Sequence, residues 1–506
     1  MSADPRAAAA AAAQWLGARE HFIDGAFCPS ADGERRQVLD PATLETIAEV
    51  AEGEGADAER AITAARRAFD DSDWSRRPAA ERAQLLEALA ALIERDADAL
   101  ARLETVDSGK TVEESRWDMG DVASVMRYYA ARARELGPDA PLEAPAPNAR
   151  SVVAREAAGV CAMICPWNYP LLQASWKVAP AIAAGCTMVL KPSELTPLST
   201  LRLAELVREA GIPDGVFNVA LGTGARVGAA LVESPAVDLV SFTGGLASGR
   251  AVMAAAARTV KRVALELGGK NPNIIFADAD LDRALEHVLE GALFHAGQIC
   301  SAGTRLLVES SVHDALVDAL AARLERIRLG HGLVEGTEMG PLISEPQRVK
   351  VNHFVLEALE AGAELRAGGV PATTGFDGAF YRPTLLGGCD ASMRAVQEEI
   401  FGPVFTVERF DSEAQALALA NGTVYGLAAG FFTRDEARIE RVSRALRFGT
   451  VWVNNFNVYF AAAPWGGYKQ SGVGRELGHA GLDEYLETKH IYRSFESSPL
   501  GWFGRR

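Results

Sequence analysis

Cys300 lies in the stretch GQICSAG (297–303), between a long helical pattern and a strand-like apolar run. A loop of small residues can present a thiol to a cleft. A nucleophilic thiol also needs a base and a donor for the developing oxyanion. His295 is five residues away and does not share a helical face with Cys300, so we expect His295 to be structural. The alternative for Cys300 is an inert, buried cysteine.

Glu266 is a carboxylate inside the apolar run VALELGG, which ends in Gly268 and Gly269. Burial without a partner disfavours the ionised form and raises the pKa. A carboxylate of that kind can act as a general base near neutral pH. The alternative is a salt bridge from Glu266 to Lys270 or Arg262.

The stretch ICPWNYP predicts a tight, non-helical turn, because Pro166 and Pro170 bracket its last residues. Asn168 in this turn can donate an amide N–H to an oxyanion. The alternative for Asn168 is a cap on the helix that follows.

Two glycine-rich turns and one strand end indicate a nucleotide site. The G-x-G-x-x-G pattern is absent, but LGTGARVG and FTGGLASG each place glycines between a strand and a helix, where backbone N–H groups can bind an anion. The stretch VLKPSE ends a strand with Lys191 and Glu194. A carboxylate there can bind both ribose hydroxyls and repels a 2′-phosphate, which favours NAD over NADP.

The secondary structure expected around these residues predicts an α/β protein. Residues 56–135 have helical periodicity, with Gly109 at the end of the second stretch. From about residue 151, short apolar runs alternate with helical stretches, and a second alternating part begins near 269. This alternation predicts parallel sheets, with ligands bound beyond the carboxyl ends of the strands. KHIYRSF, near the end of the chain, alternates like an edge strand.

Composition narrows the function classes. The chain has 506 residues, which predicts two or more domains, and its net charge of -16 argues against a nucleic-acid partner. Six scattered cysteines without a CxxC pair suggest no metal site and a reducing, cytoplasmic setting. No apolar run reaches the ~18–20 residues that cross a bilayer. The alanine run 7–13 predicts a frayed or helical tail rather than a signal peptide.

Seven motifs in order resemble the aldehyde dehydrogenase superfamily over about residues 20–495: ICPWNYP, VLKPSE, FTGG, LELGGKNP, GQICSAG, EEIFGPV and PWGGYKQSGVGRELG. The resemblance implies a Rossmann-like NAD-binding domain over 1–139 and 158–268. It further implies an α/β catalytic domain over 269–480 and a small β oligomerisation arm from 140–157 and 481–506. A homodimer or homotetramer is expected.

The resemblance also implies roles. Cys300 matches the nucleophile, Glu266 the general base, and Asn168, with the Cys300 backbone N–H, the oxyanion donors. Lys177 and Glu476 match a proton-relay pair. The expected cofactor-binding residues are Trp167, Lys191, Glu194, Gly244, Glu399 and Phe401. An aldehyde would form a thiohemiacetal on Cys300, lose hydride to NAD⁺, and leave as the acid after hydrolysis of the thioester. FTGG stands where many members have FTGS, so a serine contact to the pyrophosphate is lost.

Aromatic residues fall where the aldehyde tunnel of this family would be lined: Tyr169, Trp176, Phe294, Tyr459 and Trp465. Aromatic faces attract quaternary ammonium groups. FTGG and NVYFAAAPWGGYKQSG are similar to the betaine-aldehyde branch, so we expect betaine aldehyde to be oxidised to glycine betaine. Phe294 departs from this pattern, because some plant members have Trp there.

Other interpretations remain open. The substrate could be an ω-aminoaldehyde, trimethylaminobutyraldehyde or a broad range of aldehydes, with the aromatics serving as tunnel lining or core. A catalytically idle member and a cofactor-free thiol esterase are the alternatives from other classes.

Overall fold

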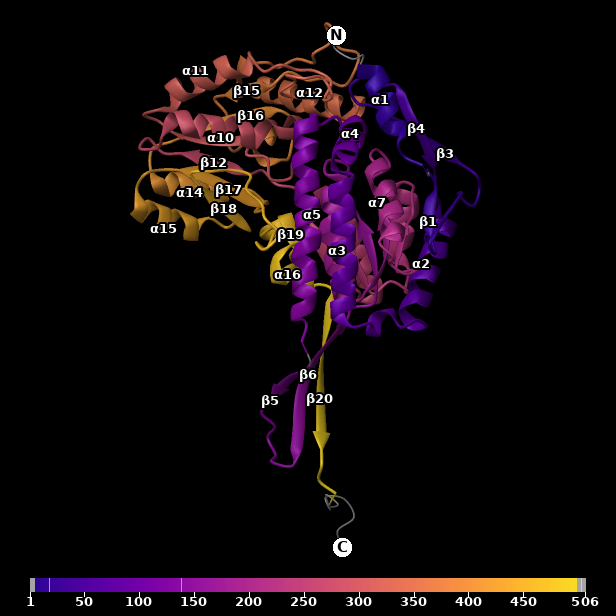
Figure 1. Cartoon of the computed structure of the whole chain (residues 1–506). Helices are drawn as coiled ribbons and strands as arrows, with labels where there is room; N and C mark the ends of the chain where they lie inside the picture. The colour runs from indigo at the N-terminus through magenta and orange to yellow at the C-terminus, as the bar shows by residue number, and fades with distance from the viewer. Residues whose placement is uncertain (1–4, 18, 138, 498–501, 503–506) are drawn as a thin grey trace.

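The computed structural model describes residues 5–17, 19–137, 139–497 and 502. Two lobes, each built around a β-sheet, lie side by side, and a long arm projects from one of them (Figure 1). The predicted α/β architecture is confirmed. None of the helices in the described part of the chain is long and apolar enough to cross a membrane.

The larger sheet has eight strands. Their order is β19 (Gly472–Val473), β11 (Arg262–Glu266), β10 (Leu239–Thr243), β7 (Val160–Ile164), β8 (Thr187–Lys191), β9 (Phe217–Val219), β1 (His21–Ile23) and β2 (Ala26–Cys28). The five strands from β11 to β9 are parallel, whereas β19, β1 and β2 run antiparallel to their neighbours. The carboxyl ends of β8, β10 and β11 carry Lys191, Thr243 and Glu266.

Both faces of this sheet are covered, because successive side chains of a strand point to opposite faces. In β7, Val160, Ala162 and Ile164 enter one core, and Cys161 and Met163 enter the other. The helices and short turns of this lobe are α1 (Pro5–Gln14), α2 (Gly55–Asp70), η1 (Trp74–Arg76), α3 (Ala79–Arg95), α4 (Ala97–Ser108), α5 (Val112–Glu135), α6 (Pro170–Ala184), α7 (Leu198–Glu209), η2 (Gly224–Gly228), α8 (Ala229–Glu233), α9 (Leu246–Ala256), η3 (Ala257–Thr259), η5 (Lys469–Ser471) and α16 (Gly478–Asp483).

The prediction of helices over residues 56–135 is confirmed, with one difference. The second predicted helical stretch is divided at Asp96, which ends α3 and begins α4. Gly109 ends α4 with a left-handed φ of 84°, as expected for a glycine C-cap. Thr111 and Glu114 then form a capping box that starts α5. The alanine run lies in α1, whose Ala9 and Ala13 are buried.

The second sheet has seven strands. Their order is β14 (Glu364–Ala367), β15 (Thr384–Gly387), β16 (Val404–Phe410), β13 (Arg305–Glu309), β12 (Pro272–Ile275), β17 (Ala428–Phe432) and β18 (Thr450–Val453). All are parallel except β14. Its helices are α10 (Leu281–Leu293), η4 (Phe294–Gly297), α11 (His313–Leu324), α12 (Glu345–Glu360), α13 (Arg394–Gln397), α14 (Glu413–Asn421) and α15 (Glu436–Ala445). Neither α12 nor β16 was predicted from the sequence.

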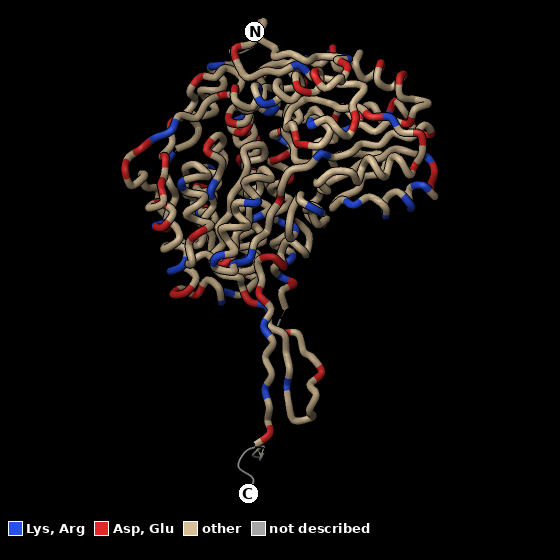
Figure 2. The backbone as a smooth tube through the Cα atoms, turned by 180° about the vertical axis from the view of Figure 1, so that it is seen from behind, with Lys and Arg blue, Asp and Glu red and all other residues tan. Residues whose placement is uncertain are grey.

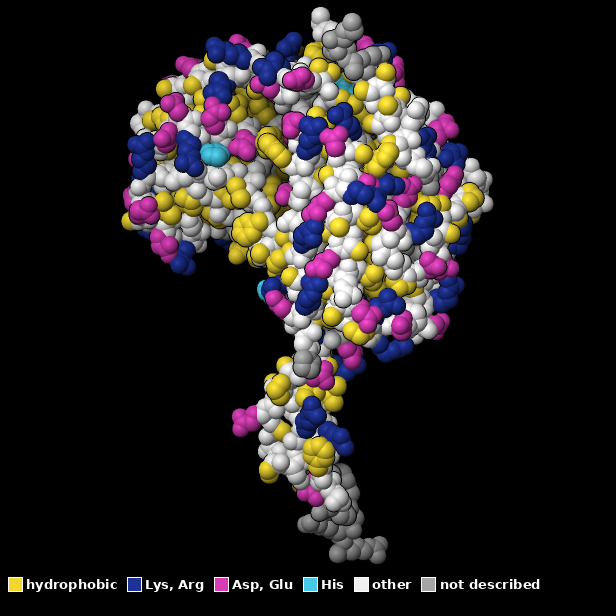
Figure 3. Space-filling model, in the orientation of Figure 1, with side chains coloured by type: hydrophobic (Ala, Val, Ile, Leu, Met, Phe, Trp, Pro, Cys, Tyr) yellow, Lys and Arg dark blue, Asp and Glu magenta, His cyan; other side chains and the backbone are white. Residues whose placement is uncertain are grey.

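The arm is a three-stranded antiparallel sheet in the order β20 (Leu486–Ser494), β6 (Ala149–Ala157) and β5 (Ala140–Leu142). The edge strand predicted from KHIYRSF is therefore confirmed. The arm exposes several hydrophobic side chains (Figure 3), namely Leu142, Ile491, Tyr492 and Phe495. A second hairpin, β3 (Arg35–Leu39) and β4 (Thr46–Ala51), stands apart from the large sheets.

The predicted domain boundaries remain a prediction. The two large sheets and the arm are built from segments similar to the three predicted domains. One strand differs, because β19, at 472–473, lies in the predicted catalytic domain but pairs with β11 of the larger sheet. Acidic and basic residues are interspersed over the face seen in Figure 2.

Candidate active site

Cys300 lies where two cavities meet. A cavity of about 340 Å³ and a narrower one of about 110 Å³ share Tyr169, Gln173 and Cys300 in their walls. Burial raises the pKa of the Cys300 thiol well above its usual range, as do the nearby Glu266 and Glu399 carboxylates, while the Ser301 backbone N–H acts in the opposite direction. The loop position is as predicted, and the thiol needs a base to become a thiolate.

Glu266 ends β11 and faces the larger cavity. Its Oε1 accepts a hydrogen bond of 2.7 Å from Trp465 Nε1, and its buried Oε2 has no partner among the described residues. Burial, followed by the charge of Glu476, raises the pKa of Glu266 well above its usual range. The structure shows no ion pair from Glu266 to Lys270 or Arg262 within the described chain, so the salt-bridge alternative is wrong.

Asn168 reaches the loop that carries the nucleophile. Its Nδ2 donates a 2.8 Å hydrogen bond to the Gln298 carbonyl. The cap of α6 is Tyr169, and no side chain makes a cap hydrogen bond there, so the helix-cap alternative for Asn168 is wrong. Asn168 and Cys300 line the same cavity, which suits an oxyanion donor.

Lys177 and Glu476 form a buried ion pair, and Lys177 Nζ also donates to Thr243 Oγ1 at 2.7 Å. Glu476 is close enough for its charge to raise the pKa of Glu266. The structure thus brings this pair, predicted from distant segments, close to the candidate base.

All six predicted cofactor-binding residues line the larger cavity: Trp167, Lys191, Glu194, Gly244, Glu399 and Phe401. The rings of Trp167 and Phe401 meet edge to face, with their centroids 5.1 Å apart. Glu399 Oε1 accepts from the Gly269 N–H at 3.1 Å, and burial raises the pKa of Glu399 to about 7.

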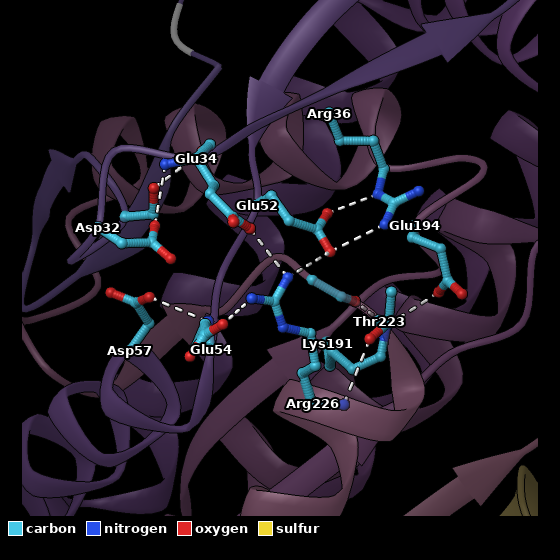
Figure 4. Close-up of polar contacts among 12 residues, drawn as sticks. Asp32, Glu34, Arg36, Glu52, Glu54, Asp57, Lys191, Glu194, Thr223 and Arg226 are labelled. Carbon is cyan, nitrogen blue, oxygen red and sulfur yellow. Dashed lines mark hydrogen bonds and ion pairs between the residues drawn. The ribbon is translucent and has the colours of Figure 1, made fainter.

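Charged side chains surround Lys191 and Glu194, which line this cavity (Figure 4). Lys191 Nζ donates to the Gly222 carbonyl at 2.8 Å and lies 3.5 Å from Glu194 Oε2. The exposed carboxylates of Asp32, Glu34 and Glu54 gather nearby, with ligand atoms within 4.8 Å of one another. Arg226 forms ion pairs with Glu34 and Glu54 and so offsets their charge. The absence of a metal stays a prediction.

All five predicted aromatic residues line the narrower cavity: Tyr169, Trp176, Phe294, Tyr459 and Trp465. The Trp465 ring centroid lies 6.2 Å from that of Trp176 and 5.1 Å from that of Tyr459. The Trp176 and Tyr459 centroids are 6.4 Å apart. The three rings therefore form one continuous aromatic wall.

Comparison with known proteins shows the family of this chain. The family model for the aldehyde dehydrogenase family matches residues 27–491. The chain belongs to the aldehyde dehydrogenase family. It is 51% identical to the betaine aldehyde dehydrogenase of Bacillus subtilis over 95% of this chain and 99% of that protein.

Two further relatives of this aldehyde dehydrogenase are informative. Aminoaldehyde dehydrogenase 2 of Zea mays is 44% identical over 97% of this chain and 98% of that protein. The crystal structure of the betaine aldehyde dehydrogenase of Staphylococcus aureus in complex with NAD⁺ superimposes with a TM-score of 0.97 at 48% identity. The superposition covers 99% of this chain and 100% of the Staphylococcus aureus chain.

Sequence reasoning missed an acidic and aromatic stripe on α5 of the aldehyde dehydrogenase. Glu114, Trp117, Asp118 and Asp121 all line the narrower cavity. Their spacing of three and four residues puts them on one helical face, which was the available signal. Trp117 meets Phe294 at 5.5 Å between ring centroids.

A buried lysine stands behind this stripe. Lys110 forms ion pairs with Asp118 and Glu104, and its Nζ lies 4.2 Å from the Tyr169 ring centroid. Burial raises the pKa of Asp118 to about 7. His295 is buried, and burial lowers its pKa well below the usual range, while its structural role stays a prediction.

The larger cavity also holds Gln347 and Lys350, from α12. Neither residue was predicted from the sequence, because no helix was expected over α12. The sequence feature that could have predicted α12 is its start, where Ser344 is followed by a proline in the first turn and accepts a hydrogen bond from the Gln347 N–H.

Proposed function

We propose that this enzyme oxidises betaine aldehyde to glycine betaine with NAD⁺, through a thioester on Cys300. The observation that carries the proposal is the place of Cys300, at the junction of a cavity lined by charged residues and an aromatic one. The relatives named betaine aldehyde dehydrogenase, and the NAD⁺ complex of one of them, support it.

The residues of the larger cavity suit NAD⁺. Lys191 and Glu194, at the carboxyl end of a parallel strand, would hold the adenosine ribose, while Glu399 and Phe401 would hold the nicotinamide ribose and ring beside Cys300. Gly245 has open space where a side chain would begin, which leaves backbone free to approach a pyrophosphate. When bound, NAD⁺ supplies the hydride acceptor.

The chain's own groups perform the remaining steps. Once deprotonated, Cys300 Sγ adds to the aldehyde carbon, and the carbonyl oxygen becomes an oxyanion. Asn168 Nδ2 and the Cys300 backbone N–H would stabilise this charge. After hydride loss leaves a thioester, Glu266 takes a proton from water, the hydroxide adds, and the carbon–sulfur bond breaks to give the acid and the thiolate. Lys177 and Glu476 would pass the proton on from Glu266.

The aromatic wall and its carboxylates suit a cationic aldehyde. Trp176, Tyr459 and Trp465 can surround a trimethylammonium group, which has no N–H to donate. Asp121 adds negative charge to the same cavity. The carboxylates also favour a second candidate, an ω-aminoaldehyde, because a primary ammonium group donates hydrogen bonds to them. Relatives named aminoaldehyde dehydrogenase support this alternative.

The decisive experiment follows NADH formation with three aldehydes: betaine aldehyde, 4-aminobutyraldehyde, and 3,3-dimethylbutanal, the uncharged isostere of betaine aldehyde. We expect kcat/KM to be highest for betaine aldehyde. Trp176→Ala should lower kcat/KM for betaine aldehyde by about tenfold, since a desolvated cation–π contact contributes about 0.5–2 kcal/mol. The same change should lower kcat/KM for the uncharged isostere less. A higher kcat/KM for 4-aminobutyraldehyde, lost in Asp121→Asn, would establish the second candidate instead.

The remaining parts of the proposal concern cofactor choice, assembly and location. Glu194 supports NAD over NADP by charge repulsion. One edge of β20 has no partner strand in the described chain, and such an edge supports assembly into a homodimer or homotetramer. All six cysteines are free, which supports a cytoplasmic location. NADH formation that requires aldehyde would exclude both an idle protein and a cofactor-free esterase.

A further inference from the structure

Three polar side chains form a closed triangle beside the nucleophile. Ser301 Oγ lies 2.6 Å from the Tyr459 hydroxyl and donates to Asn457 Oδ1 at 3.0 Å. The Tyr459 hydroxyl donates to the same Asn457 oxygen at 2.8 Å. Ser301 follows Cys300 in the chain, whereas Asn457 and Tyr459 come from the loop after β18. The triangle therefore connects the nucleophile loop to the aromatic wall.

The triangle depends on Asn457 Oδ1 as a hydrogen-bond acceptor. Ser301 and Tyr459 contribute one hydroxyl hydrogen each, and Asn457 Oδ1 contributes none. Two hydrogens serve three oxygen–oxygen contacts, and in every arrangement at least one of them points to Asn457 Oδ1. Burial raises the pKa of Tyr459 well above its usual range, so the phenol keeps its hydrogen.

Backbone structure fixes two corners of the triangle. Ser301 is completely buried, and it follows Cys300 directly in the chain. Asn457 has a φ of 61°, a left-handed conformation that asparagine adopts more readily than most residues. The acceptor therefore stands at a fixed point, and the tyrosine hydroxyl is tied to it.

These hydrogen bonds hold the Tyr459 ring, which contacts two tryptophans. Tyr459 meets Trp465 edge to face at 5.1 Å and Trp452 at 6.0 Å, and its ring is one wall of the narrower cavity. Attraction of a cation depends on which part of the ring it meets, since the face is negative and the edge positive. Fixing the hydroxyl oxygen fixes the direction of the long axis of the ring. Because a phenolic O–H prefers to lie in the ring plane, a hydrogen bond donated by it also restrains rotation of the ring about that axis.

We propose that Ser301 and Asn457 are positioning residues that hold the Tyr459 ring toward the substrate cavity and thereby set the preference for a cationic aldehyde over an uncharged one. The inference rests on the proposed function, because it concerns the same cavity. Neither residue takes part in the proposed bond-making steps.

The test compares kcat/KM for betaine aldehyde and for 3,3-dimethylbutanal in Ser301→Ala, Asn457→Gly and Tyr459→Phe. Glycine at 457 tolerates the left-handed backbone and removes the acceptor. We expect the ratio of the two kcat/KM values to fall about fivefold in each variant, roughly one cation–π contact at partial strength. In Ser301→Ala, whose side chain lines neither cavity, the rate with the uncharged aldehyde reports on folding and on Cys300 and should stay within about twofold.

A double variant sharpens the test. Ser301→Ala combined with Tyr459→Phe should be no worse than Tyr459→Phe alone, because both changes remove the same tie. Tyr492→Phe, on the exposed arm, is the matched control and should keep the wild-type ratio.

The outcomes separate the two proposals. If the wild-type enzyme oxidises both aldehydes equally well, the proposed function fails and this inference with it. If the wild type discriminates but the variants keep its ratio, or lose both rates equally, only the positioning role is overturned. Additive losses in the double variant would also overturn it.

Discussion

Trp465 Nε1 donates a 2.7 Å hydrogen bond to Glu266 Oε1, and so one side chain serves both halves of the candidate site. The Trp465 ring is part of the aromatic wall, while Glu266 faces the cavity assigned to the cofactor. The hydrogen bond stabilises the ionised carboxylate and partly offsets the rise in the pKa of Glu266 that burial causes. Substrate recognition and base strength are thereby linked.

Trp465→Phe should move the acid limb of the pH profile of kcat to higher pH. Without the donor, the pKa of Glu266 rises further, and the base is ionised only at higher pH. A hydrogen bond to a charged group contributes about 1.5 kcal/mol, so we expect a shift of about one pH unit. Steady-state rates from pH 5 to 9 check this. Trp452→Phe, whose indole N–H donates to Val458 O instead, should leave the limb in place.

Cys300→Ala should abolish aldehyde-dependent NADH formation and leave NAD⁺ binding unchanged. The side chain removed forms the thioester, whereas the residues expected to hold the cofactor remain. Fluorescence titration with NAD⁺ measures binding, and absorbance at 340 nm measures turnover. Cys389→Ala, at a buried cysteine outside both cavities, is the matched control. Aldehyde-dependent NADH formation in the alanine variant would show that another group is the nucleophile.

Lys177→Met should destabilise the protein by about 3–5 kcal/mol, because it leaves the Glu476 carboxylate buried without its cation. Lys177 is completely buried and Glu476 nearly so. Urea unfolding followed by fluorescence gives the change. Adding Glu476→Gln should restore part of the lost stability, since the unpaired charge is gone. Equal stability of the single variant and the wild type would mean that the pair is not formed in solution.

Glu194→Gln should raise kcat/KM for NADP⁺ relative to NAD⁺ by about tenfold, equivalent to about 1.4 kcal/mol of relieved charge repulsion. Glu194 lines the larger cavity beside Lys191. Steady-state kinetics with both cofactors measures the ratio. Glu205→Gln, on α7 outside this cavity, is the control. An unchanged ratio would mean that another group selects the cofactor.

Much of the fold was predictable because its signals are local. The helices over 56–135, the alternation after 151 and the edge strand of KHIYRSF depend on periodicities of a few residues. The division at Asp96 and the strand β16 were not predicted. A helix break between two good helical patterns, and a strand preceded by glycine and proline, are set by packing rather than by a local period.

Sequence motifs alone identify the family, the candidate nucleophile, base and oxyanion donor, and the set of aromatic residues, because each sits in a short motif whose residue types carry the chemistry. The hydrogen bond from Trp465 to Glu266, across 199 positions of sequence, and the contact between Ser301 and Tyr459 follow only from the tertiary structure. It also placed the carboxylates of α5 in the aromatic cavity. Such contacts depend on how two sheets and a helical layer pack against one another, and no local pattern records the distance between side chains so far apart in the chain.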